Sequence, residues 1–307
     1  MKAAVPAALA GERVDRAVAV LTGLPRSEVA ALVARGAVRL GGCAVSGRSR
    51  RVAEGDELEI TLPEAAGAAA SPQGDASVEV AVVHADEDVV VVDKRAGLVV
   101  HAGAGHHTGT LVHGLLARFP DLAAIGVGEP ARPGIVHRLD KGTSGLLVVA
   151  RTAAAYHALV EQLRRRAVER VYLALVWGSV EAPAGLVDAP VGRGVRDPTR
   201  MAVAAGGKEA RTRYRVVSRH ADPAPVSLLE CRLETGRTHQ IRVHLAAIGH
   251  PVVGDTRYRG TARPALTLPR PFLHAACLSF DHPSTGRRLS FSSPLPEDLQ
   301  ALLDELG

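Results

Sequence analysis

A run of ionisable side chains lies between two apolar stretches in "GIVHRLDKGTSGLLVVA", residues 134–150. The run contains His137, Arg138, Asp140 and Lys141. Short runs rich in Val and Leu and bounded by Gly are typical of buried strands, so we predict that the ionisable residues lie at the turn between two paired strands. A carboxylate fixed at a rigid turn can act as a nucleophile. For an arbitrary aspartate beside cations, however, a structural ion pair at a strand end is the more common arrangement.

A second cluster lies in "GRTHQIRVH", residues 236–244, at the start of a predicted helix that ends before Gly249 and Pro251. The first turn of a helix has unpaired N–H groups, so this end of the helix favours an anion. That anion is either a phosphate or a carboxylate of the protein itself. The polar side chains of the cluster are Arg237, His239, Gln240, Arg242 and His244.

Tyr172, in the apolar segment "ERVYLALVWG", is a third candidate, although a tyrosine in a strand is more often a core aromatic than a proton carrier. Other chemistries match poorly. The chain has no GxSxG, Walker A or GxGxxG motif, so Ser144 is expected to be a turn residue. The histidines of "HAGAGHH", residues 101–107, have the spacing of no metalloenzyme. We predict neither a metal nor a cofactor.

The composition is that of a globular protein with a moderate basic excess. Hydrophobic residues make up 47% of the 307 residues, and the net charge is +5. Only four of the 37 basic residues are lysines. Codon bias explains most of this preference, although the planar guanidinium also suits bidentate phosphate contacts. Aromatic residues are 3% of the chain, which argues against an RNA-binding surface of stacked rings.

The sequence predicts a protein of the reducing cytoplasm. It has no apolar run long enough to span a membrane. The short apolar segment after Lys2 is interrupted by Pro6 and followed by Glu12, which is unlike a signal peptide. The cysteines are far apart and match neither a disulfide framework nor a zinc site: Cys43, Cys231 and Cys277.

A change in composition divides the chain into two predicted domains. Residues 64–77 are small and polar with Gly and Pro, which is typical of a flexible linker. This linker separates a domain of residues 1–63 from a domain of residues 78–307.

The first domain is predicted to be a small α/β unit. Its patterns indicate two helices, a strand pair joined by a Gly-Gly turn, and a half-buried strand, at 11–23, 25–36, 37–45 and 56–62. Between Arg13 and Arg51 there are eight arginines and two acidic residues. A solvated face is the usual reason for a charge run, but this imbalance favours a phosphate-binding patch. Its candidate residues are Arg26, Arg35 and Arg39.

The second domain is predicted to be α+β with a mixed, largely antiparallel sheet, because strand and helix patterns mix without regular alternation. Strand patterns flank an acidic turn at 86–88 and occur at 134–140, 144–150, 171–178 and from 226. Helical patterns occur at 109–119, 152–166 and after the "GRTH" segment.

The motifs resemble, in order and over nearly the whole chain, those of the RluA/RluD-type pseudouridine synthases, which isomerise uridine in ribosomal or transfer RNA. The combination of HRLD and GRTHQIR is highly specific. The N-terminal domain resembles the S4 RNA-binding domain, above all in "RSEVAALVARGAVRLGG". The other matching segments are "VVDKRAGLVVH", "ERVYLALVWG", "LETGRTHQIRVHLAAIGHPVVGD" and "RPFLHAACLSFDHP".

The resemblance implies a pseudouridine synthase fold with Asp140 as the catalytic aspartate and Tyr172 near the target base. It also implies that Arg242 pairs with Asp140, and we expect a planar two-point contact that aims the carboxylate. Arg138 matches the position that takes part in flipping the base, and Arg95 stands where the family usually has proline. Further RNA contacts are expected from Lys141, Thr143, Arg237, His239 and Gln240.

The resemblance implies isomerisation of specific uridines, and we expect 23S ribosomal RNA or a pre-50S particle as the partner of a monomeric enzyme. The reaction breaks the N–C glycosidic bond, turns the uracil in place and forms a C–C bond, so the base must leave its stack. A transfer-RNA synthase of the same family is an alternative, as is a non-catalytic S4-type ribosome factor, which would form no pseudouridine. A glycosylase usually needs a second carboxylate to activate water, and these motifs contain none.

Overall fold

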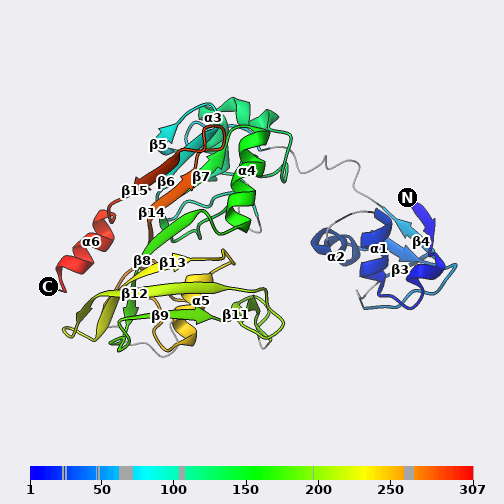
Figure 1. The fold of residues 1–307 in the computed structure, drawn as a ribbon. Coiled ribbons are helices and arrows are strands. Elements are labelled where there is room, and N and C mark those ends of the chain that lie inside the picture. The colour runs from blue at the N-terminus through cyan, green and yellow to red at the C-terminus, as the bar shows by residue number, and fades with distance from the viewer. Residues whose placement is uncertain are drawn as a thin grey trace. The chain divides into compact units, whose positions relative to one another are not determined.

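The computed structural model describes the chain except for a few single residues and short segments. These are Gly23, Pro25, Ser46, Arg48, residues 62–71, 104–107, Arg196, residues 259–265 and Gly307, together with the side chains of Ala8 and of residues 26–28. The chain divides into two compact units, Met1–Ala70 and Ser71–Gly307 (Figure 1). The predicted linker lies partly outside the described residues. Its later part, residues 72–77, belongs to the second unit, where the Asp75 amide donates to the His113 carbonyl at 2.9 Å.

The first unit is a four-stranded antiparallel sheet with two helices, in the order β1-β4-β2-β3. The predicted helices, strand pair and half-buried strand are confirmed by α1, α2, β2, β3 and β4. Gly41 and Gly42 have φ of 58° and 77°, which a tight turn between β2 and β3 requires. The elements are β1 (Lys2–Ala4), η1 (Ala7–Leu9), α1 (Val14–Thr22), α2 (Arg26–Ala34), β2 (Val38–Leu40), β3 (Cys43–Ala44) and β4 (Glu57–Ile60).

The second unit is built on a nine-stranded sheet whose main path is β5-β6-β7-β14-β8-β13-β12-β9, with β15 paired to β14. Neighbouring strands run antiparallel except β7 and β14, which run parallel. The predicted α+β class with a mixed, largely antiparallel sheet is therefore confirmed. The elements are β5 (Ala81–Ala85), β6 (Val89–Lys94), α3 (Leu111–Arg118), η2 (Pro120–Ala124), β7 (Ser144–Ala150), α4 (Ala153–Arg164), β8 (Glu169–Trp177), β9 (Ala184–Asp188), β10 (Val191–Arg193), β11 (Met201–Val203), β12 (Arg211–His220), β13 (Val226–Leu233), α5 (Gln240–Ala247), β14 (Leu273–Asp281), β15 (Arg288–Ser292) and α6 (Glu297–Asp304).

Helices cover both faces of the β5–β7 half of this sheet, and α5 lies at the β9–β12 half (Figure 1). On one face, Val90 and Val92 share a core with Leu115 of α3. On the other face, Val89 and Val91 share a core with helix α4. A strand buried on both faces needs apolar residues at successive positions, which is why β6 contains the apolar run 89–92 and β7 the apolar run 146–150.

The predicted strand at 134–140 is wrong. This segment forms only one isolated bridge, between Ile135 and Val149. The Val148 amide instead donates to Nε2 of His137 at 3.2 Å, so a side chain takes the hydrogen bond that a partner strand would have accepted. The segment is therefore an irregular connection that runs beside β7. Among the described helices, none has the length and apolar character needed to cross a membrane.

Candidate active site

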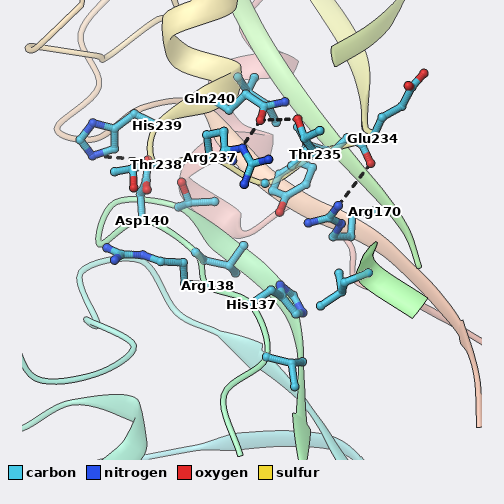
Figure 2. A pocket seen from close by; sticks show the side chains of 18 of the residues that line it. His137, Arg138, Asp140, Arg170, Glu234, Thr235, Arg237, Thr238, His239 and Gln240 are labelled. Atoms are coloured by element: carbon cyan, nitrogen blue, oxygen red, sulfur yellow. Dashed lines mark hydrogen bonds and ion pairs between the residues drawn. The ribbon is translucent and has the colours of Figure 1, made fainter. Parts of the chain in front are cut away.

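The two charged motifs and the β8 strand meet around a cavity of about 560 Å³ (Figure 2). The three predicted catalytic residues, Asp140, Tyr172 and Arg242, all line it. Of the predicted RNA-contacting residues, Arg138, Thr143, Arg237, His239 and Gln240 also line it. Lys141 is exposed and is not among the lining residues. Arg35 and Arg39 are exposed on the first unit, and the Arg26 side chain lies outside the described part of the chain.

Asp140 lies at the first position of a tight turn that leads into β7. The Thr143 amide donates to the Asp140 carbonyl at 3.1 Å and closes the turn. The turn is also tied to the loop after β6, because the Gly97 amide donates to the Lys141 carbonyl at 2.7 Å. The Asp140 side chain is 16% exposed, so its carboxylate faces the cavity from a fixed and mostly desolvated position.

Arg242, in the first turn of α5, joins Asp140 to a second carboxylate. Its Nη1 donates to Oδ2 of Asp140 at 3.0 Å. Its Nε and Nη2 donate to the two carboxylate oxygens of Asp255 at 2.6 and 3.0 Å. The predicted pairing of Arg242 with Asp140 is therefore present in the structure, but the expected two-point contact is made with Asp255. The planar guanidinium favours two parallel hydrogen bonds to one carboxylate, here that of Asp255. Asp140 receives a single N–H group from the third nitrogen, Nη1.

Asp255 is 1% exposed and holds Arg242 in place. Its Oδ1 also accepts the amides of Arg257 and Tyr258, at 2.9 and 3.1 Å. Burial acts against the charged form of Arg242, but the bonds and charge of Asp255, and then those of Asp140, outweigh it and raise the pKa of the guanidinium. One cation is thus shared by two carboxylates.

His239 faces Asp140 from the residue before α5 (Figure 2). Its backbone is left-handed, with φ of 57°, which is uncommon for a residue other than glycine. Its Nε2 lies 3.9 Å from Oδ2 of Asp140, and its Nδ1 hydrogen-bonds the Tyr258 hydroxyl at 2.8 Å. Burial lowers the pKa of His239, although Asp140 acts in the opposite direction. At neutral pH the imidazole is therefore an uncharged neighbour of the carboxylate.

The amide group of Gln240 organises the loop before α5. Its Oε1 accepts from the Thr235 hydroxyl at 2.7 Å and from the Arg237 amide at 3.0 Å. Its Nε2 donates to the Arg211 carbonyl and the Thr212 hydroxyl, both at 3.0 Å. Both ends of the amide are occupied by protein groups, so this side chain fixes the loop from which Arg237 and His239 project.

Tyr172 and Arg170 extend from the same face of β8, two residues apart. Tyr172 is 5% exposed, and burial raises its pKa to about 12, while the positive charge of Arg170 acts in the opposite direction. The phenol is therefore protonated at neutral pH. Arg170 is 6% exposed, and burial lowers its pKa.

The cavity has an exposed basic rim and a buried interior. Arg138 and Arg237 are exposed at its margin. Arg170 lies across the cavity from Asp140, near His137 (Figure 2). Within the residues that the structure describes, no group of three or more His, Cys, Asp or Glu side chains is placed to hold a metal ion.

Three residues of this site had no role assigned from the sequence: Asp255, Tyr258 and Arg170. Asp255 ends "GHPVVGD", a matching segment in which only the helix signals were interpreted. Arg170 precedes Tyr172 by two residues in an apolar strand, and that spacing indicates a charge on the same face as the tyrosine. No local pattern marks Tyr258, because its contact with His239 depends on the folded chain.

Comparisons with known proteins identify the family of this chain. A family model described as RNA pseudouridylate synthase matches residues 88–247. The chain is 43% identical over 311 residues to ribosomal large subunit pseudouridine synthase D of Nitrosomonas europaea, covering 98% of this chain and 86% of that protein. It is 43% identical over 283 residues to the RNA pseudouridine synthase YlyB of Bacillus subtilis, covering 92% and 89%. The solved structure of human RNA pseudouridylate synthase domain containing 1 matches 75% of this chain and 90% of that one, with a TM-score of 0.59 and 28% identity.

Proposed function

This chain belongs to the RNA pseudouridylate synthase family, and we propose that it isomerises specific uridines of large-subunit ribosomal RNA, with Asp140 acting at the nucleoside. The substrate is supported by the name of its relative in Nitrosomonas europaea, a ribosomal large subunit pseudouridine synthase. The observation that carries the proposal is the contact between Asp140 and Arg242. They are 102 residues apart in sequence and meet in a cavity also lined by Tyr172.

In the proposed reaction, the target uridine leaves its stack and its base enters the cavity. The N1–C1′ bond breaks, and its electron pair stays with the uracil. A carboxylate oxygen of Asp140 bonds to C1′ or stabilises its positive charge. After the uracil turns, C5 bonds to C1′, and any bond between C1′ and Asp140 breaks with its electron pair returning to the carboxylate. The C5 proton then leaves, and N1 gains a proton. Nothing is released, provided that water does not reach C1′.

Arg242 and Asp255 are positioning residues in this scheme. The two-point contact with Asp255 fixes the plane of the guanidinium, and the third N–H group then holds Asp140 at 3.0 Å. Tyr172 contacts the base as a protonated phenol, because its pKa of about 12 keeps it from acting as a base at neutral pH.

The remaining assignments concern RNA binding. Arg138, with Lys141, Thr143, Arg237 and His239, contacts the flipped nucleotide and its neighbours, whereas Gln240 holds the loop. Residues 1–63 form an S4-like domain that binds phosphates through Arg26, Arg35 and Arg39, and residues 78–307 carry the catalysis. The protein acts as a monomer in the cytoplasm, where ribosomes are assembled in the bacteria that encode its relatives.

The test is Asp140→Asn, which is nearly isosteric but removes the carboxylate. We expect pseudouridine formation in a large-subunit ribosomal RNA transcript to fall below detection, while the Kd for that RNA changes less than about threefold. Asp121→Asn is the matched control, because Asp121 is a surface aspartate that pairs with Arg151, and neither residue lines the cavity. Normal turnover by Asp140→Asn would exclude the mechanism. If the wild-type enzyme modifies transfer RNA but not ribosomal RNA, ribosomal RNA is excluded as the substrate.

A further inference from the structure

Arg170 is a buried cation without a carboxylate partner among the described residues. It is 6% exposed, and its one hydrogen bond to a described residue is long, from Nη2 to the Leu233 carbonyl at 3.5 Å. Its Nε is buried and has no hydrogen-bond partner in the described part of the chain. Burying an unpaired charge is costly, so an arginine kept in this state indicates a group that it meets only when substrate is bound.

The other deeply buried arginine of the cavity shows the contrast. Arg242 is 8% exposed and contacts two carboxylates. At the rim, Arg166 is 36% exposed and pairs with Glu209 and Glu234. Arg170 is as buried as Arg242 but lacks the compensation that both of these arginines have within the described chain.

His137 adds a second donor at the same end of the cavity. Its Nε2 accepts from the Val148 amide, so the proton of the neutral ring is on Nδ1, which is buried and has no described partner. The ring stays neutral because burial, followed by the charge of Arg170, lowers its pKa to about 3. Two N–H donors thus line this region without an acceptor, which favours an electron-rich ligand.

We propose that Arg170, assisted by His137, stabilises the negative charge that develops on the uracil when the glycosidic bond breaks. This inference rests on the proposed isomerase function. When the N1–C1′ electron pair stays with the uracil, the charge spreads over N1, O2 and O4. A donor without a partner in the free enzyme then gains its interaction mainly in the transition state, which accelerates the reaction instead of only tightening binding.

The depth of Arg170 favours the base over a phosphate as its ligand. The phosphates of a flipped nucleotide stay on the RNA backbone and so remain near the exposed rim, where Arg138 and Arg237 lie. The base is the part that enters the buried interior, where Arg170 neighbours Tyr172 on β8.

Gly236 allows an independent test, because it leaves room for this guanidinium. A Cβ at residue 236 would lie 2.8 Å from Nη1 of Arg170, and its only other neighbour within 4 Å is Cζ of the same side chain. Gly236→Ala therefore displaces the Arg170 guanidinium without removing its charge.

The experiment compares wild type, Arg170→Gln, Arg170→Lys and Gly236→Ala under single-turnover conditions with saturating enzyme. Each is tested on large-subunit ribosomal RNA transcripts that contain uridine or 5-fluorouridine. Fluorine withdraws electrons and stabilises the uracil anion without help from the protein. Loss of the N-linked target nucleoside is followed by nuclease digestion and chromatography, because 5-fluorouridine has no C5 proton to lose and cannot give pseudouridine. Arg232→Gln is the charge-matched control, because Arg232 pairs with Glu169 and Glu230 outside the cavity lining.

We expect Arg170→Gln to slow conversion of uridine about 100-fold, the scale seen when one donor to a developing anion is removed. Arg170→Lys and Gly236→Ala should show smaller losses, Arg232→Gln none, and the Kd for RNA should change less than about threefold. With 5-fluorouridine the loss in Arg170→Gln should shrink severalfold. Weaker RNA binding at an unchanged rate would identify a phosphate contact and overturn the proposal. An equal loss with both nucleosides would show that Arg170 only positions the base, and would also overturn it. Failure of the wild-type enzyme to form pseudouridine would instead contradict the proposed function.

Discussion

Arg242 divides its guanidinium unequally between two aspartates, with two hydrogen bonds to Asp255 and one to Asp140. The two-point contact fixes the plane of the guanidinium, and this plane decides where the third N–H group points. The orientation of the Asp140 carboxylate therefore depends on Asp255, a residue that it does not contact. The Asp140 carboxylate shares its cation, so under the proposed mechanism it keeps more negative charge for the reaction at C1′ than a two-point ion pair would leave it.

This sharing predicts that Arg242→Lys will be nearly as damaging as Arg242→Ala. An ammonium keeps the charge but lacks the planar fork, so it cannot bind both oxygens of Asp255 and also hold Asp140. We expect single-turnover rates at saturating enzyme to fall roughly 100-fold in both variants, the cost of a misplaced catalytic group.

Asp255→Asn gives the corresponding double-mutant cycle. If Asp255 acts through Arg242, its loss combined with Arg242→Lys should reduce the rate little further than Arg242→Lys alone. The RNA Kd of Asp255→Asn should stay close to that of wild type. Additive losses in rate, or a loss confined to RNA affinity, would contradict the positioning role.

At the scale of elements, local patterns predicted the strands and helices of the core well. The apolar runs of β6 and β7 and the helical spacing of α3 and α4 record burial directly, and all four elements are present. The segment 134–140 also begins with an apolar stretch but is not a strand, because His137 takes the Val148 amide. A side chain that replaces a backbone partner leaves no periodic signal, so the sequence could not reveal it.

The site was predictable where a motif carried it and unpredictable where the fold did. Asp140, Tyr172 and Arg242 are in specific motifs, and the structure brings them together. The unequal sharing of Arg242 depends on Asp255, which the turn after α5 returns to the helix. The spacing of Arg242 and Asp255 in the sequence does not predict that their side chains meet, and only the folded chain shows this contact.

Lys94, at the end of β6, connects the loop after that strand to the turn that carries Asp140. It is 1% exposed, and its Nζ donates to the carbonyls of Arg95 and Leu98 at 2.9 and 2.8 Å, and to that of Lys141 at 3.4 Å. These contacts brace the loop that contains Arg95, where the family resemblance predicts a proline.

The burial of Lys94 predicts a pH-dependent stability. Burial lowers its pKa from the ordinary 10.5 to about 7, although Asp140 acts in the opposite direction. Between these values the unfolded chain binds more protons than the folded chain, so this contribution to stability rises with pH and is lost as the pH falls towards 7. We expect the unfolding free energy of wild type relative to Lys94→Met to increase by on the order of 2 kcal/mol between pH 7.5 and 9.

Urea unfolding at the two pH values measures this difference. Lys208→Met is the matched control, because Lys208 is exposed and its replacement should give no pH-dependent difference from wild type. A Lys94→Met difference that stays constant, or that shrinks as the pH rises, would show that the buried amine remains charged.

At the scale of the whole molecule, we propose that the first unit binds RNA and that the second unit carries the chemistry. The cavity and its lining residues belong to the second unit alone. The first unit presents a set of exposed arginines, of which Arg13 and Arg16 pair with Asp15 and Glu12. The exposed arginines in the described part of this unit are Arg13, Arg16, Arg35, Arg39, Arg50 and Arg51. Codon bias explains the abundance of arginine in the chain, but not the eight arginines against two acidic residues between Arg13 and Arg51.

A chain that begins at Pro72 should therefore fold and keep its single-turnover rate at saturating enzyme, but bind RNA more weakly. Pro72 is the appropriate start because a Cβ at Gly74 would lie 2.8 Å from the Ala117 backbone, which shows that this segment packs on α3. Each phosphate contact releases counterions when RNA binds, so the truncated chain should release fewer of them. The slope of log Kd against log salt concentration should therefore fall by roughly 0.7 to 0.9 for each contact that is lost. Kd measured between 50 and about 200 mM salt gives the slope. For the full-length double variant Arg35→Gln/Arg39→Gln, the slope should lie between those of the wild-type and truncated chains. If the truncated chain has the wild-type slope, these arginines are a solvated face, and the phosphate contacts belong to the rim of the cavity.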